Sequence, residues 1–304
     1  MALRLRIALL VVTAASAALA GAGSLAKPAA ASQLIDRNAS AIHLAVDAKG
    51  EALITYRARG KLQHVLAWHA ENAIAPTRAR TQVAFSLDYA GGWGKYRTDY
   101  WKTFRNVCRT YTGPPLAWKV TACTAPDGSH WALQAWQRGL PDLGRAPTAA
   151  QAQWELRLSH WTGPQPVLSI ELNWAYKRFD HLFGTLTYAG QSVYGFHSTA
   201  GGAPLDSFGR NVYVDTYDSA YGSGWKRENS FLTHNSSGAF CYGFYPHGAS
   251  PAGNGTSYRA TVEGPGVTPD VMWQALAPGP FDAAVEADAN ASIRELGDNQ
   301  CKPV

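Results

Sequence analysis

Apolar and polar side chains alternate residue by residue through much of the chain, the pattern of a β-strand with one buried face. In residues 41–46, for example, Ile42, Leu44 and Val46 alternate with small or polar residues. Gly-containing turns at 47–50 and 58–61 separate this run from two further short runs, at 53–56 and 62–68. Short alternating runs joined by such turns predict antiparallel hairpins.

The same two-residue period continues to the C-terminal part of the chain. It predicts further strands at residues 118–123, 131–135, 154–159, 168–174, 183–188, 192–197, 212–217, 239–245, 258–263 and 271–275. Many short strands and few helices predict an all-β fold, and we expect an antiparallel, jelly-roll-like β-sandwich with hairpin additions.

Only two stretches favour helices, so we expect one or two short ones. Residues 147–153 could form two helical turns, with Pro147 in the first turn. Residues 282–296 carry a thin apolar stripe and predict a C-terminal helix. The Gly- and Pro-containing connector at 138–147 is the candidate boundary within a β-rich domain of residues 32–280, and residues 281–304 form a helix and tail.

The N-terminus has the three parts of a secretory signal peptide. Arg4 and Arg6 precede an apolar stretch that starts at Ile7, and small residues follow at 28–32. We predict cleavage after Ala31, with Ala20 as the second choice. The strongly apolar part is too short to span a bilayer, so we expect a secreted or extracytoplasmic protein without a membrane anchor after processing. The Ala- and Arg-rich composition is typical of a bacterial protein.

Removal of residues 1–31 changes the charge of the chain. The loss of Arg4, Arg6 and Lys27 leaves 24 basic and 22 acidic residues, a net charge of +2 in place of +5. A nearly neutral domain without a Lys/Arg run lacks the electrostatic footprint of a nucleic-acid-binding protein.

An even number of cysteines in an exported chain indicates disulfides. Three pairings of Cys108, Cys123, Cys241 and Cys301 are formally open. We favour Cys108–Cys123, which closes a local loop, and Cys241–Cys301, which ties the tail back. A zinc site would need closely spaced Cys/His pairs, which the sequence lacks.

Tryptophan supplies the first candidate binding chemistry. Trp118, Trp131, Trp154 and Trp174 share strand faces with aliphatic residues, which predicts core positions. Trp93 and Trp225 differ, because each lies in a Gly-rich stretch four residues after a tyrosine, Tyr89 or Tyr221, and just before a lysine or a glycine–lysine pair. Glycine-hinged loops could place these flat rings at the surface beside hydrogen-bonding groups, which is a carbohydrate-binding arrangement.

The densest polar segment, residues 206–247, supplies the candidate catalytic chemistry. Tyr213, Asp215 and Tyr217 point away from Val212 and Val214 on one predicted strand. Glycoside hydrolysis uses two carboxylates on either side of the scissile bond, and Asp215 and Glu228 are the best such pair.

Two other chemistries remain open in the same segment. A polysaccharide lyase could use Tyr213, Tyr217 or His234 as a base and Arg210 to neutralise a uronate. Asp206, Asp215 and Asp218 are candidate oxygen ligands for a structural calcium; no other cofactor or metal is expected.

We therefore expect a secreted or surface-associated protein that binds an oligo- or polysaccharide without catalysis. The expected ligand-binding residues are Trp93, Trp225, Tyr213, Tyr217, Tyr221, Arg210 and Arg227. The alternatives are a polysaccharide-cleaving enzyme that uses the Asp215/Glu228 region and a structural envelope protein without a small-molecule site.

Overall fold

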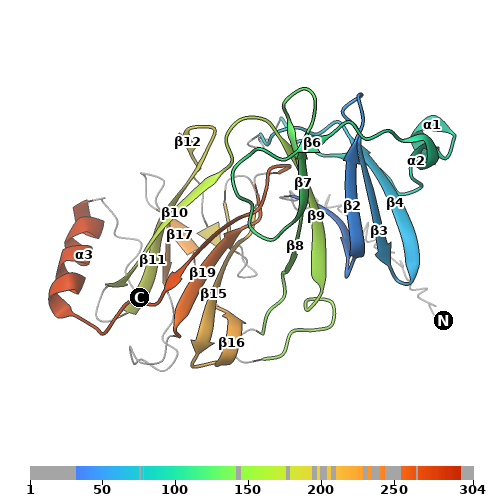
Figure 1. Ribbon diagram of the computed structural model, residues 1–304. Coiled ribbons are helices and arrows are strands. Elements are labelled where there is room, and N and C mark those ends of the chain that lie inside the picture. The colour runs from blue at the N-terminus through green and yellow to red at the C-terminus, as the bar shows by residue number, and fades with distance from the viewer. Residues whose placement is uncertain are drawn as a thin grey trace, which may run out of the picture.

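The computed structural model confirms a mostly β protein built from antiparallel sheets (Figure 1). It describes residues 32–74, 77, 79–141, 145–175, 179–193, 197–198, 204–206, 210–228, 232–234, 240–243, 255–264 and 266–295. The predicted leader at 1–31 and the predicted Cys241–Cys301 disulfide, through Cys301, lie outside these residues.

Two sheets form the first half of the molecule. Sheet I has the strand order β2 (Ser40–Val46), β3 (Ala52–Ala58), β4 (Lys61–Trp68) and β5 (Ser86–Asp88). Sheet II has the order β1 (Gln33–Arg37), β9 (Trp154–Trp161), β8 (His130–Gln137), β7 (Lys119–Thr124) and β6 (Arg109–Thr110). Both sheets contribute to one core, in which Ile54 and Tyr56 of β3 pack with Leu133 of β8 and Leu156 of β9, so the first half is a β-sandwich.

Two further sheets form the second half. Sheet III has the order β16 (Gly222–Arg227), β15 (Val212–Ser219), β19 (Ser257–Val262) and β20 (Val271–Leu276). Sheet IV has the order β10 (Val167–Ala175), β11 (Phe179–Tyr188), β18 (Phe240–Gly243) and β17 (Leu232–His234), with β12 (Gln191–Ser192) paired to β11. β13 (His197–Ser198) pairs with β14 (Pro204–Leu205).

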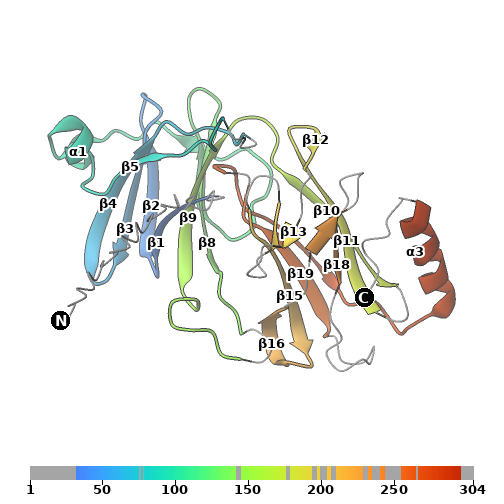
Figure 2. The ribbon, with the colours of Figure 1, turned by 180° about the vertical axis from the view of Figure 1, so that it is seen from behind.

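The second half has its own core. Val212 and Val214 of sheet III pack with Leu182 and Phe240 of sheet IV. The fold is therefore sandwich-like in both halves, which stand side by side in Figure 2.

One segment of the second half crosses into the first. Val267, between β19 and β20, belongs to the first core, and its carbonyl accepts a hydrogen bond from the His160 N–H at 2.7 Å. The connector at 138–147 joins β8 to β9, which are hydrogen-bonded neighbours in sheet II. Strands up to β9 therefore contribute to the first core, and strands after β9 contribute to the second. The predicted domain boundary near 138–147 stays a prediction.

The helices are short, and the first follows two glycines in a stretch that the sequence pattern did not assign to a helix. α1 (Trp93–Tyr96) and α2 (Tyr100–Thr103) lie beside sheet I, and α3 (Ala283–Glu295) matches the predicted C-terminal helix. The prediction of two helical turns at 147–153 was wrong: a turn forms there, closed by the Thr148 carbonyl accepting from the Gln151 N–H at 2.9 Å. Among the described helices none is long and apolar enough to cross a membrane.

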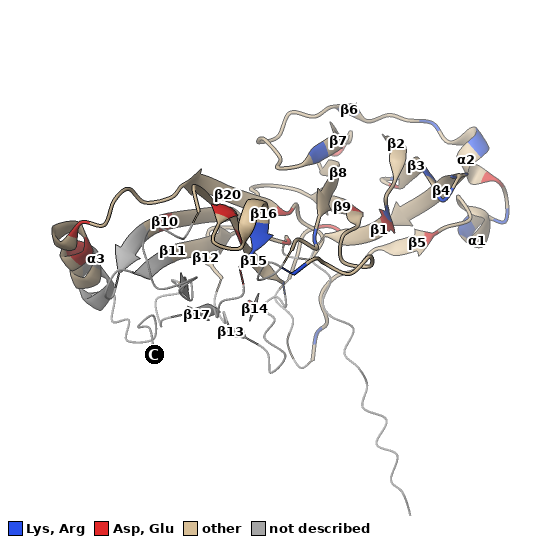
Figure 3. Ribbon diagram, turned by 90° about the horizontal axis from the view of Figure 1, so that it is seen from below, with Lys and Arg blue, Asp and Glu red and all other residues tan. Residues whose placement is uncertain are grey.

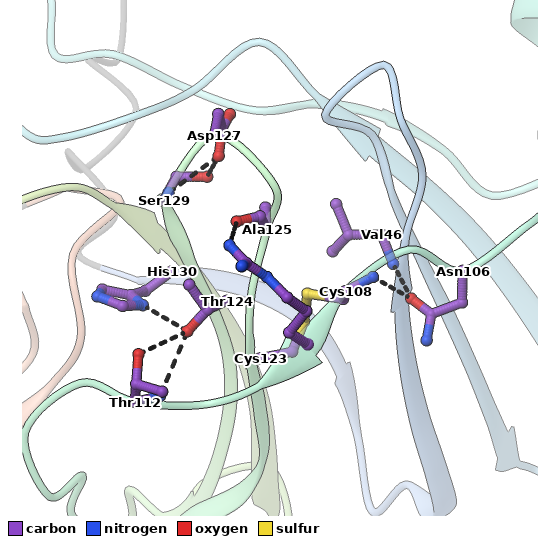
Figure 4. The surroundings of a disulfide bond; sticks show 11 residues. Val46, Asn106, Cys108, Thr112, Cys123, Thr124, Ala125, Asp127, Ser129 and His130 are labelled. Carbon is purple, nitrogen blue, oxygen red and sulfur yellow. Dashed lines mark hydrogen bonds between the residues drawn. A yellow bond between two sulfur atoms is a disulfide. The ribbon is translucent and has the colours of Figure 1, made fainter.

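The predicted Cys108–Cys123 disulfide is confirmed, with the two Cα atoms 5.7 Å apart (Figure 4). It closes a 15-residue separation where β6 meets β7. The Asn106 side-chain oxygen accepts hydrogen bonds from the N–H groups of Val46 and Cys108, at 3.0 and 3.1 Å. The disulfide and this amide together attach the segment after α2 to both sheets of the first half.

Candidate functional site

One face of sheet III gathers most of the predicted binding residues. On β15, Val212 and Val214 turn into the second core, so Tyr213, Asp215 and Tyr217 occupy the opposite face. Strand register places Asp215 between Arg227 of β16 and Arg259 of β19, and Tyr217 opposite Trp225. We call Tyr213, Asp215, Tyr217, Trp225, Arg227 and Arg259 the aromatic–arginine face; the basic residues of β16 are blue in Figure 3.

Asp215 anchors both arginines of this face. The Arg227 Nε–H donates to Asp215 Oδ1 at 2.5 Å, and Arg259 donates to Oδ2 through Nε at 3.1 Å and Nη2 at 2.8 Å. The Asp215 residue is 1% exposed. A buried carboxylate is stable when charged donors saturate its oxygens, and this geometry gives Asp215 a positioning role.

The two guanidinium groups lie on aromatic rings. Arg259 Cζ is 4.2 Å from the centre of the Trp225 ring, and Arg227 Cζ is 4.0 Å from that of Tyr213. Tyr217 and Trp225 meet edge to face, with centroids 5.1 Å apart. Cation–π and edge-to-face contacts fix ring orientations, so Trp225 is held on two sides. Tyr217 is the more exposed ring, at 38%.

Residues of the first half contact the buried end of the aromatic–arginine face, at Tyr213. Trp118 stacks on Trp136 with centroids 5.1 Å apart, and Trp136 meets Tyr213 edge to face at 5.9 Å. The Arg138 Nε–H donates to the Tyr213 hydroxyl at 2.7 Å. The site is therefore composite, and its aromatic rings run from the buried Trp136 outward to the exposed Tyr217.

The backbone of the connector also contacts this sheet. The Arg227 N–H donates to the Pro141 carbonyl at 2.9 Å, on the open edge of β16. This bond covers part of an edge strand that would otherwise present unpaired amides.

Three predicted binding residues lie away from the face. Trp93 is the first residue of α1, which lies beside sheet I, and its side chain is 51% exposed. In Figures 1 and 2, α1 lies at the end of the first half that is far from β16. Arg210 is fully buried in an ion pair with Asp206. Tyr221 lies in the turn between β15 and β16, where its N–H donates to Ser219 Oγ at 3.3 Å.

The segment around Trp225 is not the glycine-hinged loop that we expected. It forms strand β16, paired with β15 from Asp215↔Arg227 to Ser219↔Gly222. The core prediction also failed for Trp154, which is 53% exposed at the start of β9, whereas Trp131 is fully buried as expected.

The candidate catalytic carboxylates point to opposite sides of sheet III. Glu228 directly follows β16, and its Oε1 accepts a hydrogen bond from the Thr216 hydroxyl. Thr216 neighbours Asp215 on β15 and therefore faces the other way. This placement on opposite sides of the sheet does not favour a hydrolase, which needs both carboxylates beside one cleft; the catalytic assignment stays a prediction.

Two of the candidate lyase residues, Tyr213 and Arg210, are poorly suited to their expected roles. Burial and the nearby Glu263 raise the pKa of Tyr213 to about 12, although Arg138 and Arg227 oppose the shift. A phenol with a raised pKa is a weaker acid and so forms the phenolate base less readily near neutral pH. Arg210 is engaged by Asp206, and the His234 side chain lies outside the described residues.

Each of the three candidate calcium ligands bonds a different protein group. Asp206 pairs with Arg210, Asp215 with two arginines, and Asp218 Oδ1 accepts the Gly224 N–H at 2.6 Å. Throughout the described ranges, no three His, Cys, Asp or Glu side chains gather in a way that could hold a metal ion.

Sequence reasoning missed Trp136 and Arg138, which contact Tyr213, and also Arg259 and Trp118. Arg259 stands in a predicted strand between Tyr258 and Ala260, and only the register of β19 against β15 places it opposite Asp215. Trp118 was assigned to the core but lies partly exposed, with its ring 6.0 Å from Arg259 Cζ. The alternation around Arg259 was a usable signal for its face, but nothing in the sequence indicated its partner.

A hollow of about 370 Å³ lies at the junction of the two halves. Pro114 and Pro115 line it from the first half, and Met272 of β20 from the second. Its other walls include Pro164, Pro166, Val167 and Leu168.

Comparison of the chain with protein-family models, with curated proteins and with solved structures finds no match in any of the three.

Proposed function

We propose that the protein is a non-catalytic glycan-binding protein whose binding surface is the outer end of the aromatic–arginine face. The observation that carries this proposal is the pair Tyr217 and Trp225 on adjacent strands, partly exposed and fixed edge to face. Aromatic rings held at a surface present apolar faces against which the C–H groups of a sugar ring pack.

The arginines support the proposal by preorganising this surface. Arg259 bridges the buried Asp215 and the Trp225 ring. A ring that is already oriented loses little conformational entropy when a ligand binds. Asp215 acts in this scheme as an anchor for cations, since its two oxygens are turned toward Arg227 and Arg259.

The same contacts argue against advancing a polysaccharide-cleaving enzyme. Cleavage through Asp215 would need its carboxylate to reach the substrate, and it is 1% exposed behind two guanidinium groups. No described contact favours a second function over glycan binding.

The test is a glycan-array screen of the purified protein, followed by titration of each glycan that binds. Trp225→Ala and Tyr217→Ala should each weaken binding by about tenfold or more, a loss of about 1.4 kcal/mol or more. The matched control is Trp154→Ala, which removes a 53% exposed tryptophan outside sheet III and should leave affinity unchanged.

Thermal unfolding of each variant shows whether a loss of binding reflects a loss of structure. Absence of any glycan ligand for the unmodified protein, or unchanged affinity in a folded Trp225→Ala variant, would refute the proposal.

A further inference from the structure

Asp270 is a fully buried carboxylate at the junction of the two halves. Its Oδ1 accepts a hydrogen bond from the Ser32 hydroxyl at 2.7 Å, and its Oδ2 accepts one from Trp136 Nε1–H at 2.9 Å. The Gln134 side chain bonds the Asp270 backbone twice, accepting from its N–H and donating to its carbonyl, both at 3.0 Å. The carboxylate therefore has a fixed position.

This carboxylate has hydrogen bonds but no ion pair within the part of the chain that the structure describes. Arg157 is the nearby buried cation, and it pairs with Glu155 at 2.5 Å and Glu263 at 2.9 Å. Burial raises the pKa of Asp270 to about 6; Arg157 opposes the shift and Glu263 adds to it. A buried carboxylate without a paired cation is costly in its charged form.

Among the described residues near Asp270, buried carboxylates outnumber buried arginines. The buried cations Arg157 and Arg210 face four buried carboxylates, those of Asp206, Glu155, Glu263 and Asp270. Two further described arginines, Arg37 and Arg138, pair with Glu155 and Glu263 from the rim, where their side chains are 45% and 41% exposed.

Ser32 contacts both the Asp270 carboxylate and the buried Arg157. It is fully buried, its hydroxyl donates to Asp270, and its carbonyl accepts from Arg157 Nη1–H at 3.0 Å. The leader predicted from the sequence ends at Ala31, so Ser32 would be the first residue after processing. Covalent geometry keeps an α-nitrogen within roughly 4 Å of the hydroxyl oxygen of the same serine, and thus close to Asp270.

We propose that hydrolysis of the Ala31–Ser32 bond creates an N-terminal ammonium group that compensates the buried Asp270 and locks the two halves together. Water adds across the peptide bond, leaving a carboxylate on Ala31 and an amine on Ser32 that takes up a proton. In this proposal the leader is removed before the exported chain folds, so the burial of Ser32 in the folded protein does not obstruct cleavage.

The first test is mass spectrometry of the protein exported from its full-length gene. The expected N-terminal residue is Ser32. A mature chain that begins elsewhere, for example after Ala20, overturns the proposal.

The second test compares a chain that begins at Ser32 with one that carries a single glycine before Ser32, both released from the same cleavable tag. The glycine moves the ammonium group away, so the thermal midpoint at pH 7 should fall by about 4 °C or more. Equal midpoints contradict the proposal.

Asp270→Asn separates charge from steric effects in this comparison. With a neutral side chain at 270, the added glycine should no longer change the midpoint if the effect is the ammonium–carboxylate pair. A glycine effect that persists unchanged in Asp270→Asn shows crowding instead and overturns the proposal.

The pH profile gives a readout that needs no substitution at 270. Without the ammonium group, the folded state binds a proton at Asp270 with a pKa of about 6, against an ordinary aspartate pKa of 3.8. Stability of the glycine-extended chain therefore falls as pH rises through that interval. The ammonium group should have a raised pKa when folded, so its contribution is present below about pH 8 and lost as pH rises through the folded value.

The midpoint difference between the two chains should consequently be largest near pH 6–8 and shrink on either side. A difference that is constant with pH contradicts the ammonium–carboxylate pair.

Discussion

The segments around Trp93 and Trp225 read alike in sequence but fold differently. Each has a tyrosine, glycines, a tryptophan and a base in the same order. The first becomes the helical turn α1, and the second becomes strand β16. Gly91 and Gly92 are needed for close packing, because a Cβ would lie 2.8 Å from the Trp101 ring and 2.5 Å from Tyr100 Cβ, respectively. Gly224, by contrast, has open space around it.

Both segments are anchored by a buried carboxylate, but the cations stack on different rings. Glu51 holds Lys95 and accepts from the Tyr96 hydroxyl at 2.7 and 2.8 Å. Lys95 Nζ then lies over Trp68, with 4.4 Å to the ring centre, and not over Trp93. Arg259 lies over Trp225 itself. An anchored cation orients only the ring that it covers, so the second segment presents a fixed tryptophan.

The largest effect should come from removing the two anchors. We expect Asp215→Ala to cost roughly 3–5 kcal/mol, because it leaves two mostly buried guanidinium groups without their carboxylate. Glu51→Ala should cost less, about 1–3 kcal/mol, since Lys95 is 27% exposed and can be hydrated. Urea unfolding measures both.

The ranking of the two anchor variants is the informative result. A Glu51→Ala cost equal to or above that of Asp215→Ala would mean that the two segments are anchored alike. Asp215→Asn serves as the conservative control and should retain part of the stability.

Alanine at the glycines tests the packing difference. Gly92→Ala should lose about 2–3 kcal/mol, because φ is +103° and the new methyl group meets Tyr100 Cβ. Gly224→Ala should lose only about 1 kcal/mol, the cost of a left-handed conformation in open space, with φ +73°. Thermal unfolding of the two single variants is sufficient, and similar losses would contradict the contrast.

The smallest effect is expected at Trp93. Within the described residues no ring or cation stacks on its side chain, and the ring is 51% exposed. Trp93→Ala should change stability by no more than about 0.5 kcal/mol and leave affinity for any glycan ligand unaltered. Weakened glycan binding in this variant would show that both segments contribute to recognition.

Local patterns predicted many of the strands but not which strands pair with each other. Alternation in 41–46 and 212–217 correctly separated core-facing from outward-facing residues, because the side-chain period of a strand is two. The Cys108–Cys123 pair was predictable because it closes a short loop. β16 was missed because its glycines resemble a turn, and pairing with β15 outweighs their weak strand preference.

The candidate site was predictable only in part, for a related reason. Tyr213, Asp215 and Tyr217 share a face by alternation alone. Three further features depend on contacts between separate strands. Glu228 turns to the opposite side of the sheet, Arg259 joins the aromatic–arginine face, and Trp118 lies beside Arg259.

The sequence by itself determined the all-β class, the local disulfide and the outward orientation of the residues on β15, since each follows from interactions within a few residues or from the alternation of a single strand. Only the tertiary structure decided which strands are neighbours, which carboxylate anchors which cation and which tryptophan is held at the surface. Those outcomes depend on register and on the packing of two sandwich-like halves, and neither is encoded in a local pattern.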